Sequence, residues 1–248
     1  MRFFSSDANR SGDEIALLAP DAVHISRVLR MKAGDAVVIC DDVGFEHDCV
    51  LVSVSKDRVL ARIVQSRPYS TEPSVGVTVF AALSKGERFD FLIQKCVEVC
   101  ASAIVPFISE HCVARPDERD YERKQARYAR IALEASKQAL RSRPVQVSAI
   151  QSFEQALQQA ASYETAILLY ERENRRSFSQ ILRGSGDCTR YAVMTGPEGG
   201  FSEREVQLAV HSGLEPASLG PRILRCETAP VAAVCAIMYH TGNYDIGV

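Results

Sequence analysis

The stretch MTGPEGGF (residues 194–201) links an apolar, strand-like run to a predicted helix, and the stretch LGPRILRCETA (residues 219–229) repeats this arrangement further along the chain. Glycines at strand–helix junctions permit positive φ angles and remove the Cβ atoms that would keep a ligand away from the backbone. Because the two turns share this design, they predict one small-molecule pocket that both of them line.

Each turn is followed by a recognisable helix start. Ser202 and Glu205 form a capping box, which predicts a helix that ends near Gly213. After the second turn, Thr228 is expected to cap a helix that has Pro230 in its first turn. Because this second helix is apolar on every side, we expect it to be buried, in part against a second subunit.

The N-terminal part of the chain predicts a small β-barrel. The chain has 248 residues, of which 46% are hydrophobic and 24% charged, so a small module joined to a larger one is expected. The predicted strands are residues 23–32, 36–40, 47–54 and 58–65. Two prolines within polar residues 66–74 predict a linker. We therefore expect two domains, residues 1–70 and 74–248.

From residue 75 on, strands alternate with helices, which predicts an α/β domain with a largely parallel sheet. The expected strands are residues 75–80, 103–107, 165–170, 191–195 and 216–219, and the expected helices include 88–100 and 118–140. The chain lacks both the dinucleotide pattern G-x-G-x-x-G after a strand and the P-loop pattern. A standard dinucleotide or phosphate-cradling site is therefore not expected.

Charge, hydropathy and cysteine content limit the classes of protein to which the chain can belong. The net charge is −2, yet residues 115–143 carry nine lysines and arginines against five acids, which indicates a basic face or, alternatively, a solvated helix with internal ion pairs. No apolar run is long enough to span a bilayer, and we expect a cytoplasmic protein without a membrane partner. The eight cysteines and five histidines lack ligand spacing, so reduced cysteines and no metal are expected.

Four motifs, in order, resemble those of a known family. They are HISRVLRMKAGD (residues 24–35), KGER with QKCVE (85–88 and 94–98), GPEGGF (196–201) and LGPRILRCETA (219–229). This combination resembles the bacterial 16S ribosomal RNA uracil-N3 methyltransferases of the SPOUT superfamily, over nearly the whole chain. The resemblance implies a PUA-like RNA-binding β-barrel at residues 1–70 and a SPOUT methyltransferase domain with a trefoil knot at 74–248. It also implies a homodimer joined through the knotted region.

The resemblance further implies methyl transfer from S-adenosylmethionine to N3 of a uridine in 16S ribosomal RNA, within the 30S subunit. The implied cofactor-binding residues are Leu169, Tyr170, Thr195, Gly196, Pro197, Glu198, Gly199, Gly200, Leu219, Gly220, Ile223, Leu224, Arg225, Thr228 and Ala229. Two alternatives remain open: a SPOUT enzyme that acts on a ribose 2′-oxygen or on transfer RNA, and an RNA-binding protein without activity.

The reaction requires uracil N3 to lose its proton, and an arginine is suited to stabilise the anion that develops. The expected catalytic residues are Arg225, Arg141 and Glu198, the last as a base, a positioning group or an anchor of its loop. Whether Arg141 or Arg143 has the family's role stays open. The residues expected to bind RNA, through phosphate contacts, are Arg30, Lys32, Lys85, Arg88, Arg123, Arg127 and Arg143.

Overall fold

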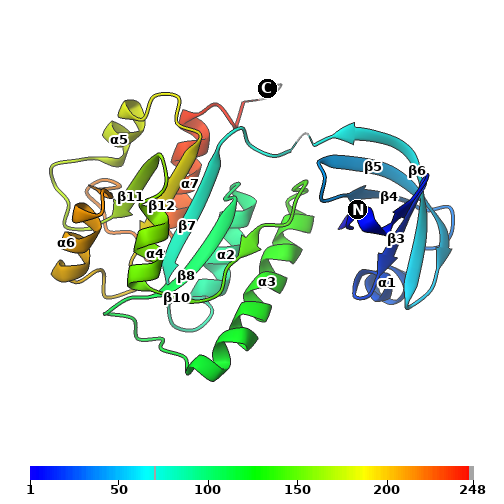
Figure 1. The fold of residues 1–248 in the computed structure, drawn as a ribbon, viewed down its shortest axis with the longest axis horizontal. Helices are drawn as coiled ribbons and strands as arrows, with labels where there is room; N and C mark the ends of the chain where they lie inside the picture. Colours follow the sequence, from blue (N-terminus) through cyan, green and yellow to red (C-terminus); the bar gives the residue numbers. More distant parts are fainter. Residues whose placement is uncertain (70, 246–248) are drawn as a thin grey trace. The chain divides into compact units, whose positions relative to one another are not determined.

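The computed structural model describes residues 1–69 and 71–245 (Figure 1). The chain divides into two compact units, and each has its own hydrophobic core. The first unit contains Met1–Glu72 and Ser136–Pro144, and the second contains Pro73–Ala135 and the residues from Val145 on. Within the described residues, no helix has the length and apolar character needed to cross a membrane.

The first unit is a curled, six-stranded sheet in the order β1-β4-β5-β6-β3-β2 (Figure 1). Its strands are β1 (Arg2–Phe4), β2 (Arg10–Ser11), β3 (Glu14–Leu18), β4 (Ala36–Cys40), β5 (Phe45–Val54) and β6 (Arg58–Pro68). The long β5–β6 hairpin is antiparallel and has two register shifts, which are typical of strands that bend. Apolar side chains such as Phe3, Ile39 and Leu51 fill the concave side.

Two expectations for the first unit are wrong. Residues 23–32 form no strand: a helical turn α1 (Asp21–Val23) runs into a π-helical segment (His24–Val28). The physical reason is that Ala22, Ile25 and Leu29 repeat at helical spacing, and this spacing puts Ala22 and Ile25 into the core. Strand β6 also continues to Pro68, inside the segment predicted as a linker.

A buried ion pair fixes residues 136–144 within the first unit. The Arg141 guanidinium, whose side chain is only 3% exposed, donates to both carboxylate oxygens of Glu72, with Nη2 2.6 Å from Oε2. Glu72 Oε1 also accepts the backbone N–H of Ser142 at 2.8 Å. Burial would raise the pKa of Glu72, but the bonds and charge of Arg141 and the backbone N–H groups outweigh burial and lower it. Glu72 is therefore held as a carboxylate.

Replacing Glu72 by glutamine should destabilise the protein in a pH-dependent manner. Because the Glu72 pKa is lower in the folded state, its stabilising effect is present above about pH 4.5 and is lost as the pH falls through the folded pKa. We expect Glu72→Gln to lower the free energy of unfolding by about 3 kcal/mol at pH 7, since it leaves the buried Arg141 charge without its carboxylate. Urea-induced unfolding at pH 7 and pH 3 measures this difference.

The control for this variant is Glu14→Gln, which removes a more exposed carboxylate that pairs with Arg62 in the same unit. It should change stability by less than about 1 kcal/mol. An equal loss at both pH values for Glu72→Gln would show that packing, and not charge, accounts for its effect.

The second unit is built on a parallel sheet of seven strands. The order is β10-β8-β7-β12-β11-β13, and β9 pairs with β8. The strands are β7 (Gly76–Ala82), β8 (Ala103–Ile108), β9 (Gln146–Val147), β10 (Gln151–Ser152), β11 (Thr165–Leu169), β12 (Arg190–Thr195) and β13 (Glu215–Ala217). Strands β7, β11 and β12 are almost wholly buried, as expected for parallel strands that are covered on both faces. The predicted parallel α/β class is confirmed.

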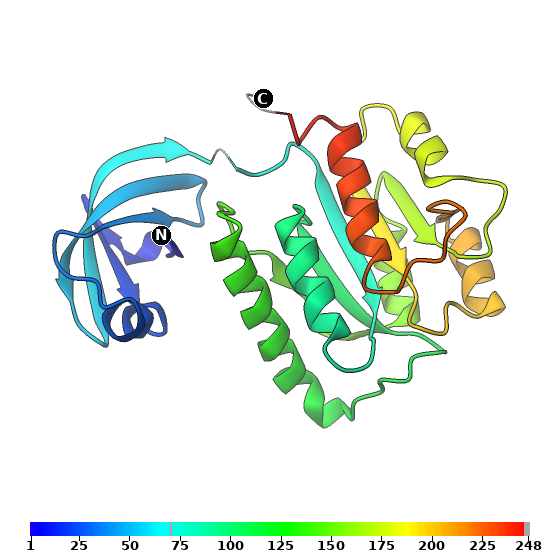
Figure 2. The same cartoon turned by 180° about the vertical axis from the view of Figure 1, so that it is seen from behind.

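Helices cover both faces of this sheet. They are α2 (Arg88–Glu98), α3 (Tyr121–Gln138, preceded by a 3-10 turn at Glu118–Asp120), α4 (Phe153–Ala160), α5 (Phe178–Gly184), α6 (Glu203–His211) and α7 (Ala229–His240). Helices α2 and α7 lie side by side on one face (Figure 2), and α4 lies on the other (Figure 1). The predicted capping box of α6 is present, and Gly213 follows the helix with a φ of +93°.

Helix α7 is partly buried in the single chain, and its first turn differs from the prediction. Its side chains Ala233, Val234, Ile237 and Met238 are buried, but the opposite side is only half-buried, and Tyr239 is 79% exposed. Burial of this other side against a second subunit stays a prediction. Thr228 has helical dihedral angles and its side chain makes no capping hydrogen bond, so the predicted cap is wrong.

Candidate functional site

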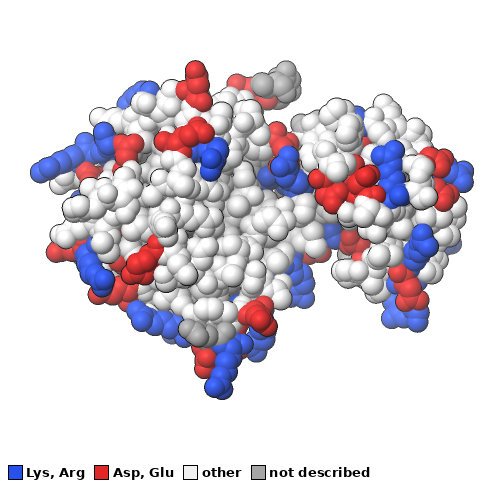
Figure 3. Space-filling view, viewed as in Figure 1, with Lys and Arg blue, Asp and Glu red and all other residues white. Residues whose placement is uncertain are grey.

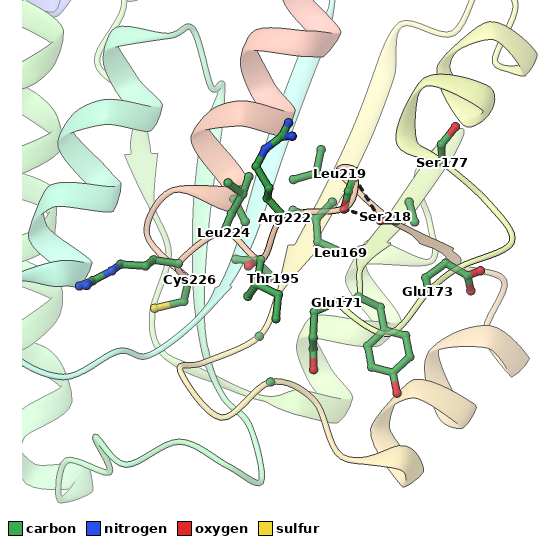
Figure 4. A pocket seen from close by; sticks show the side chains of 18 of the residues that line it. Leu169, Glu171, Glu173, Ser177, Thr195, Ser218, Leu219, Arg222, Leu224 and Cys226 are labelled. Carbon is green, nitrogen blue, oxygen red and sulfur yellow. Dashed lines mark hydrogen bonds between the residues drawn. The ribbon is translucent and has the colours of Figure 1, made fainter.

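The carboxyl ends of strands β11, β12 and β13 surround a cavity of about 1,060 Å³ (Figure 4). This volume is at the upper end of the roughly 300–1,000 Å³ that is typical of small-molecule sites. Three segments line the cavity: residues 169–171 and 173–177 after β11, 195–200 after β12 and 217–227 after β13. Ligands of α/β proteins bind at this edge of a parallel sheet. The two glycine-bearing turns therefore line the same cavity.

Every predicted cofactor residue except Thr228 lines this cavity. The resemblance implies that the loop after residues 165–170 surrounds the cofactor, and that loop does line the cavity. Its charged residues Glu171, Glu173, Arg175 and Arg176 were not selected individually, nor were Cys226 and Glu227 of the last loop. The signal that could have found the charged segment is its position: polar residues directly after a buried parallel strand lie at the ligand-binding edge.

Gly200 has a conformation that other residues adopt with strain. Its φ is +68°, and a Cβ atom built there would lie 2.6 Å from Oε1 of Glu171. Gly196 is also closely packed, since a Cβ atom there would lie 3.2 Å from the Phe201 ring. Gly199 differs: its Cβ would meet His111 at 3.1 Å, but its φ is not positive. Residues 195–200, which we call the first loop, can therefore pack closely because the glycines at positions 196, 199 and 200 have no side chains.

Glu198 fixes the first loop to the start of helix α2. Its Oε1 accepts the backbone N–H of Lys85 at 2.9 Å and Nη1 of Arg88 at 3.0 Å. Partial burial would raise the pKa of Glu198, but the hydrogen bonds from Lys85 and Arg88 and the charge of Arg88 lower it. A carboxylate held in its ionised form by two donors is a weak proton acceptor at neutral pH. The contacts of Glu198 therefore support the role of holding its loop in place.

The anchoring geometry predicts a small effect for Glu198→Gln. Because the amide oxygen can still accept one of the two hydrogen bonds, we expect the KM for the cofactor to rise about fivefold and kcat to stay nearly constant. The pH at which kcat falls on the acidic side should be the same as in the wild type. Steady-state kinetics at several pH values measures kcat and KM for the wild type and for Glu198→Gln. The control is Glu203→Gln, which removes the same charge outside the cavity. A loss of kcat by about 100-fold or more would assign Glu198 to proton transfer.

Residues 217–227, which we call the second loop, include two arginines among the residues that line the cavity, Arg222 and Arg225. Within the described part of the chain, neither guanidinium forms an ion pair. The carbonyl of Arg225 accepts the N–H groups of Thr228 and Ala229, so the start of helix α7 fixes its backbone. Figure 4 shows Arg222 beside Leu219 and Leu224, and these leucines and Leu169 give the cavity apolar walls.

The remaining predicted residues lie elsewhere. Arg141 is not among the residues that line the cavity, and its guanidinium bonds to Glu72 as described above. Arg143 is exposed, with its guanidinium 5.6 Å from the Tyr69 ring centroid. Arg30 has a φ of +53°, and Lys32 donates its backbone N–H to Asp35.

Of the cations expected to contact RNA in the second unit, several already have acidic partners. Arg88 pairs with Glu198, Arg123 with Asp120 at 3.0 Å, and Arg127 with Asp90. Arg123 thus fits the alternative of local ion pairs, since Asp120 lies three positions before it, whereas Arg127 pairs with Asp90 of helix α2.

Comparison with known proteins identifies the family. The RNA methyltransferase domain family matches residues 71–238, and the RNA methyltransferase PUA domain family matches residues 19–64. The chain is 35% identical to ribosomal RNA small subunit methyltransferase E of Bacillus subtilis over 88% of this chain and 87% of that protein. It belongs to the ribosomal RNA small subunit methyltransferase E family. The family expected from the four motifs is thereby confirmed.

Other similar proteins agree with this assignment. The Synechocystis protein is 32% identical, over 90% of this chain and 72% of its own. The structure of the Neisseria gonorrhoeae enzyme bound to S-adenosyl methionine is 30% identical, with a TM-score of 0.81 and 96% of each chain covered. A Legionella pneumophila methyltransferase in complex with the same cofactor is 26% identical, with a TM-score of 0.85 and 96% of each chain covered.

Proposed function

We propose that this protein transfers the methyl group of S-adenosylmethionine to N3 of a uridine in the RNA of the small ribosomal subunit. The single observation that carries the proposal is the cavity, because both glycine-bearing loops line it together with the segment after β11. Membership of the methyltransferase E family and the cofactor-bound relatives support it.

The chemistry of the cavity suits this cofactor. Leu169, Leu219 and Leu224 offer apolar walls for a flat, neutral adenine ring. The carboxylates of Glu171, Glu198 and Glu227 also line the cavity, and they complement a ligand that carries a sulfonium and an ammonium group. When bound, the cofactor supplies an activated methyl group on its sulfur.

The protein's own residues then act on the base. Uracil N3 becomes nucleophilic only when its proton leaves to solvent water, and negative charge then spreads over the neighbouring carbonyl oxygens. Arg225 lines the cavity and its guanidinium forms no ion pair within the described residues, so we infer that it stabilises this charge. The loops contribute by positioning, since they hold donor and acceptor in one orientation. Glu198 holds the first loop against Lys85 and Arg88.

We further propose the finer architecture of the family: a PUA-like RNA-binding domain at residues 1–70, and a SPOUT domain with a trefoil knot at 74–248. A homodimer would cover the half-buried side of α7, which carries Cys235, Ala236 and the exposed Tyr239. Of the two arginines after α3, we infer that Arg143 contacts RNA, because its side chain is exposed and that of Arg141 is buried. The 30S particle is the proposed substrate.

The test combines binding and product analysis. Calorimetry with S-adenosylmethionine should show binding, and 30S subunits from a strain without the gene should gain N3-methyluridine when incubated with protein and cofactor. Mass spectrometry of the digested RNA identifies the product, and naked 16S RNA serves as the comparison substrate. Methylation of a ribose oxygen or of transfer RNA would contradict the proposal, and a folded protein that fails to bind the cofactor would favour an RNA-binding protein without activity.

A further inference from the structure

One side of the cavity is basic, and none of the motifs pointed to it. The segment after β11 and helix α5 contribute Arg175, Arg176 and Arg183 to the lining. Residues 171–183 contain four arginines and two acids, a net charge of +2. Figure 3 shows Lys and Arg side chains at the edge of the second unit where α5 and the loop before it lie, at the left of the view. We call Arg175 and Arg183 the rim arginines.

The rim arginines have no acidic partner within the described residues, whereas Arg176 pairs with Glu215. The two acids of the segment have other contacts. Glu173 Oε1 accepts the backbone N–H groups of Arg175 at 2.6 Å and Arg176 at 3.1 Å, so it fixes the loop. Glu171 lies against Gly200. The guanidinium groups of both rim arginines are therefore available to an anion.

The backbone of this segment is hydrogen-bonded to the second glycine-bearing loop. Ser218 donates its N–H to the carbonyl of Arg176 at 3.0 Å, and the Ser218 carbonyl accepts the N–H of Phe178 at 2.9 Å. Ser177 and Ser218 thus form a parallel β-bridge directly before Leu219. The capping box of Ser177 and Gln180 then starts helix α5, and Arg183 lies in its last turn. The rim arginines are consequently fixed relative to the site of methyl transfer.

We propose that Arg175 and Arg183 bind the RNA phosphates that flank the target nucleotide. The inference rests on the proposed function and deepens it. A base that enters the cavity must leave its stack, which brings its neighbouring phosphates to the rim. Arginine is suited to phosphate because its planar donors bind two oxygens at once. One arginine in the loop and one in the helix offer separate sites, which fits successive phosphates better than the single carboxylate of the cofactor.

The test uses the full-length protein with Arg175→Gln and Arg183→Gln combined. We expect its dissociation constant for unmethylated 30S subunits to rise on the order of tenfold. With a single-stranded RNA, the slope of log K against log salt concentration should become shallower by about 1.4, the value for two lost phosphate contacts. The dissociation constant for S-adenosylmethionine should stay within about twofold, since binding of the cofactor does not involve these charges.

The matched control is Arg172→Gln combined with Arg204→Gln, which removes the same charge at exposed positions that do not line the cavity. It should retain wild-type RNA affinity. Equal weakening by both double variants would overturn the proposal, as would weakened cofactor binding in the first or an unchanged salt slope. If the wild-type protein transfers no methyl group to RNA, the proposed function fails, whereas wild-type activity with an unaffected rim variant refutes only the inference.

Discussion

Gly200→Val is expected to lower the affinity for S-adenosylmethionine by at least about 100-fold while RNA affinity remains near that of the wild type. The φ of +68° is strained for any residue with a Cβ atom, and that atom would lie 2.6 Å from the Glu171 carboxylate. Either the loop or Glu171 must therefore move, and both line the cavity. Calorimetry with the cofactor and a parallel RNA-binding measurement separate the two affinities.

A suitable control is Gly213→Val, because Gly213 has a φ of +93° with no atom near its missing Cβ and lies outside the cavity. It should lower the melting temperature through backbone strain yet keep cofactor affinity. Gly199→Val should weaken binding less than Gly200→Val, since its φ is not positive and only His111 must give way. Wild-type cofactor affinity in Gly200→Val would remove the first loop from the proposed site.

Arg225→Gln is expected to reduce kcat by about 100- to 1,000-fold, the effect of removing one donor that stabilises a developing anion. Cofactor affinity should change little, because the proposed role is to act on the base. Single-turnover kinetics at saturating cofactor and RNA measures the chemical step directly.

Arg222→Gln provides the comparison for this variant, since Arg222 lies in the same loop and also lines the cavity. Its effect on kcat should be smaller by at least tenfold if Arg225 is the residue that contacts the base. If Arg225→Gln raised only the KM for RNA and left kcat unchanged, Arg225 would be a binding residue and the proposed charge stabilisation would be incorrect.

Local rules predicted much of the catalytic unit. The capping box of Ser202 and Glu205, the buried strands β11 and β12, and the two glycine-bearing turns were all readable from the sequence. Each depends on neighbouring residues in the chain, and parallel topology then brings the turns to one edge. Residues 23–32 were misassigned because short apolar repeats fit a strand and a helix nearly equally well.

Local sequence patterns could not predict the contacts between residues that are far apart in the chain. Arg141 and Glu72 are 69 positions apart, and Glu198 meets Lys85 across 113 positions. No pattern in the sequence indicates which of many arginines meets which acid. The roles left open for Glu198 were therefore narrowed only by the hydrogen bonds in the structure. The loop after β11 was expected at the cofactor, but its charged residues were not selected individually because the loop contains no glycine turn.

The β-bridge between Ser177 and Ser218 has a consequence for how the two ligands affect each other's binding. It joins the segment of the proposed phosphate-binding arginines to a wall of the cavity, so we expect that ordering one of them also orders the other. Thermodynamic linkage then requires reciprocity: the factor by which bound S-adenosylmethionine lowers the dissociation constant for RNA equals the factor by which bound RNA lowers the dissociation constant for S-adenosylmethionine.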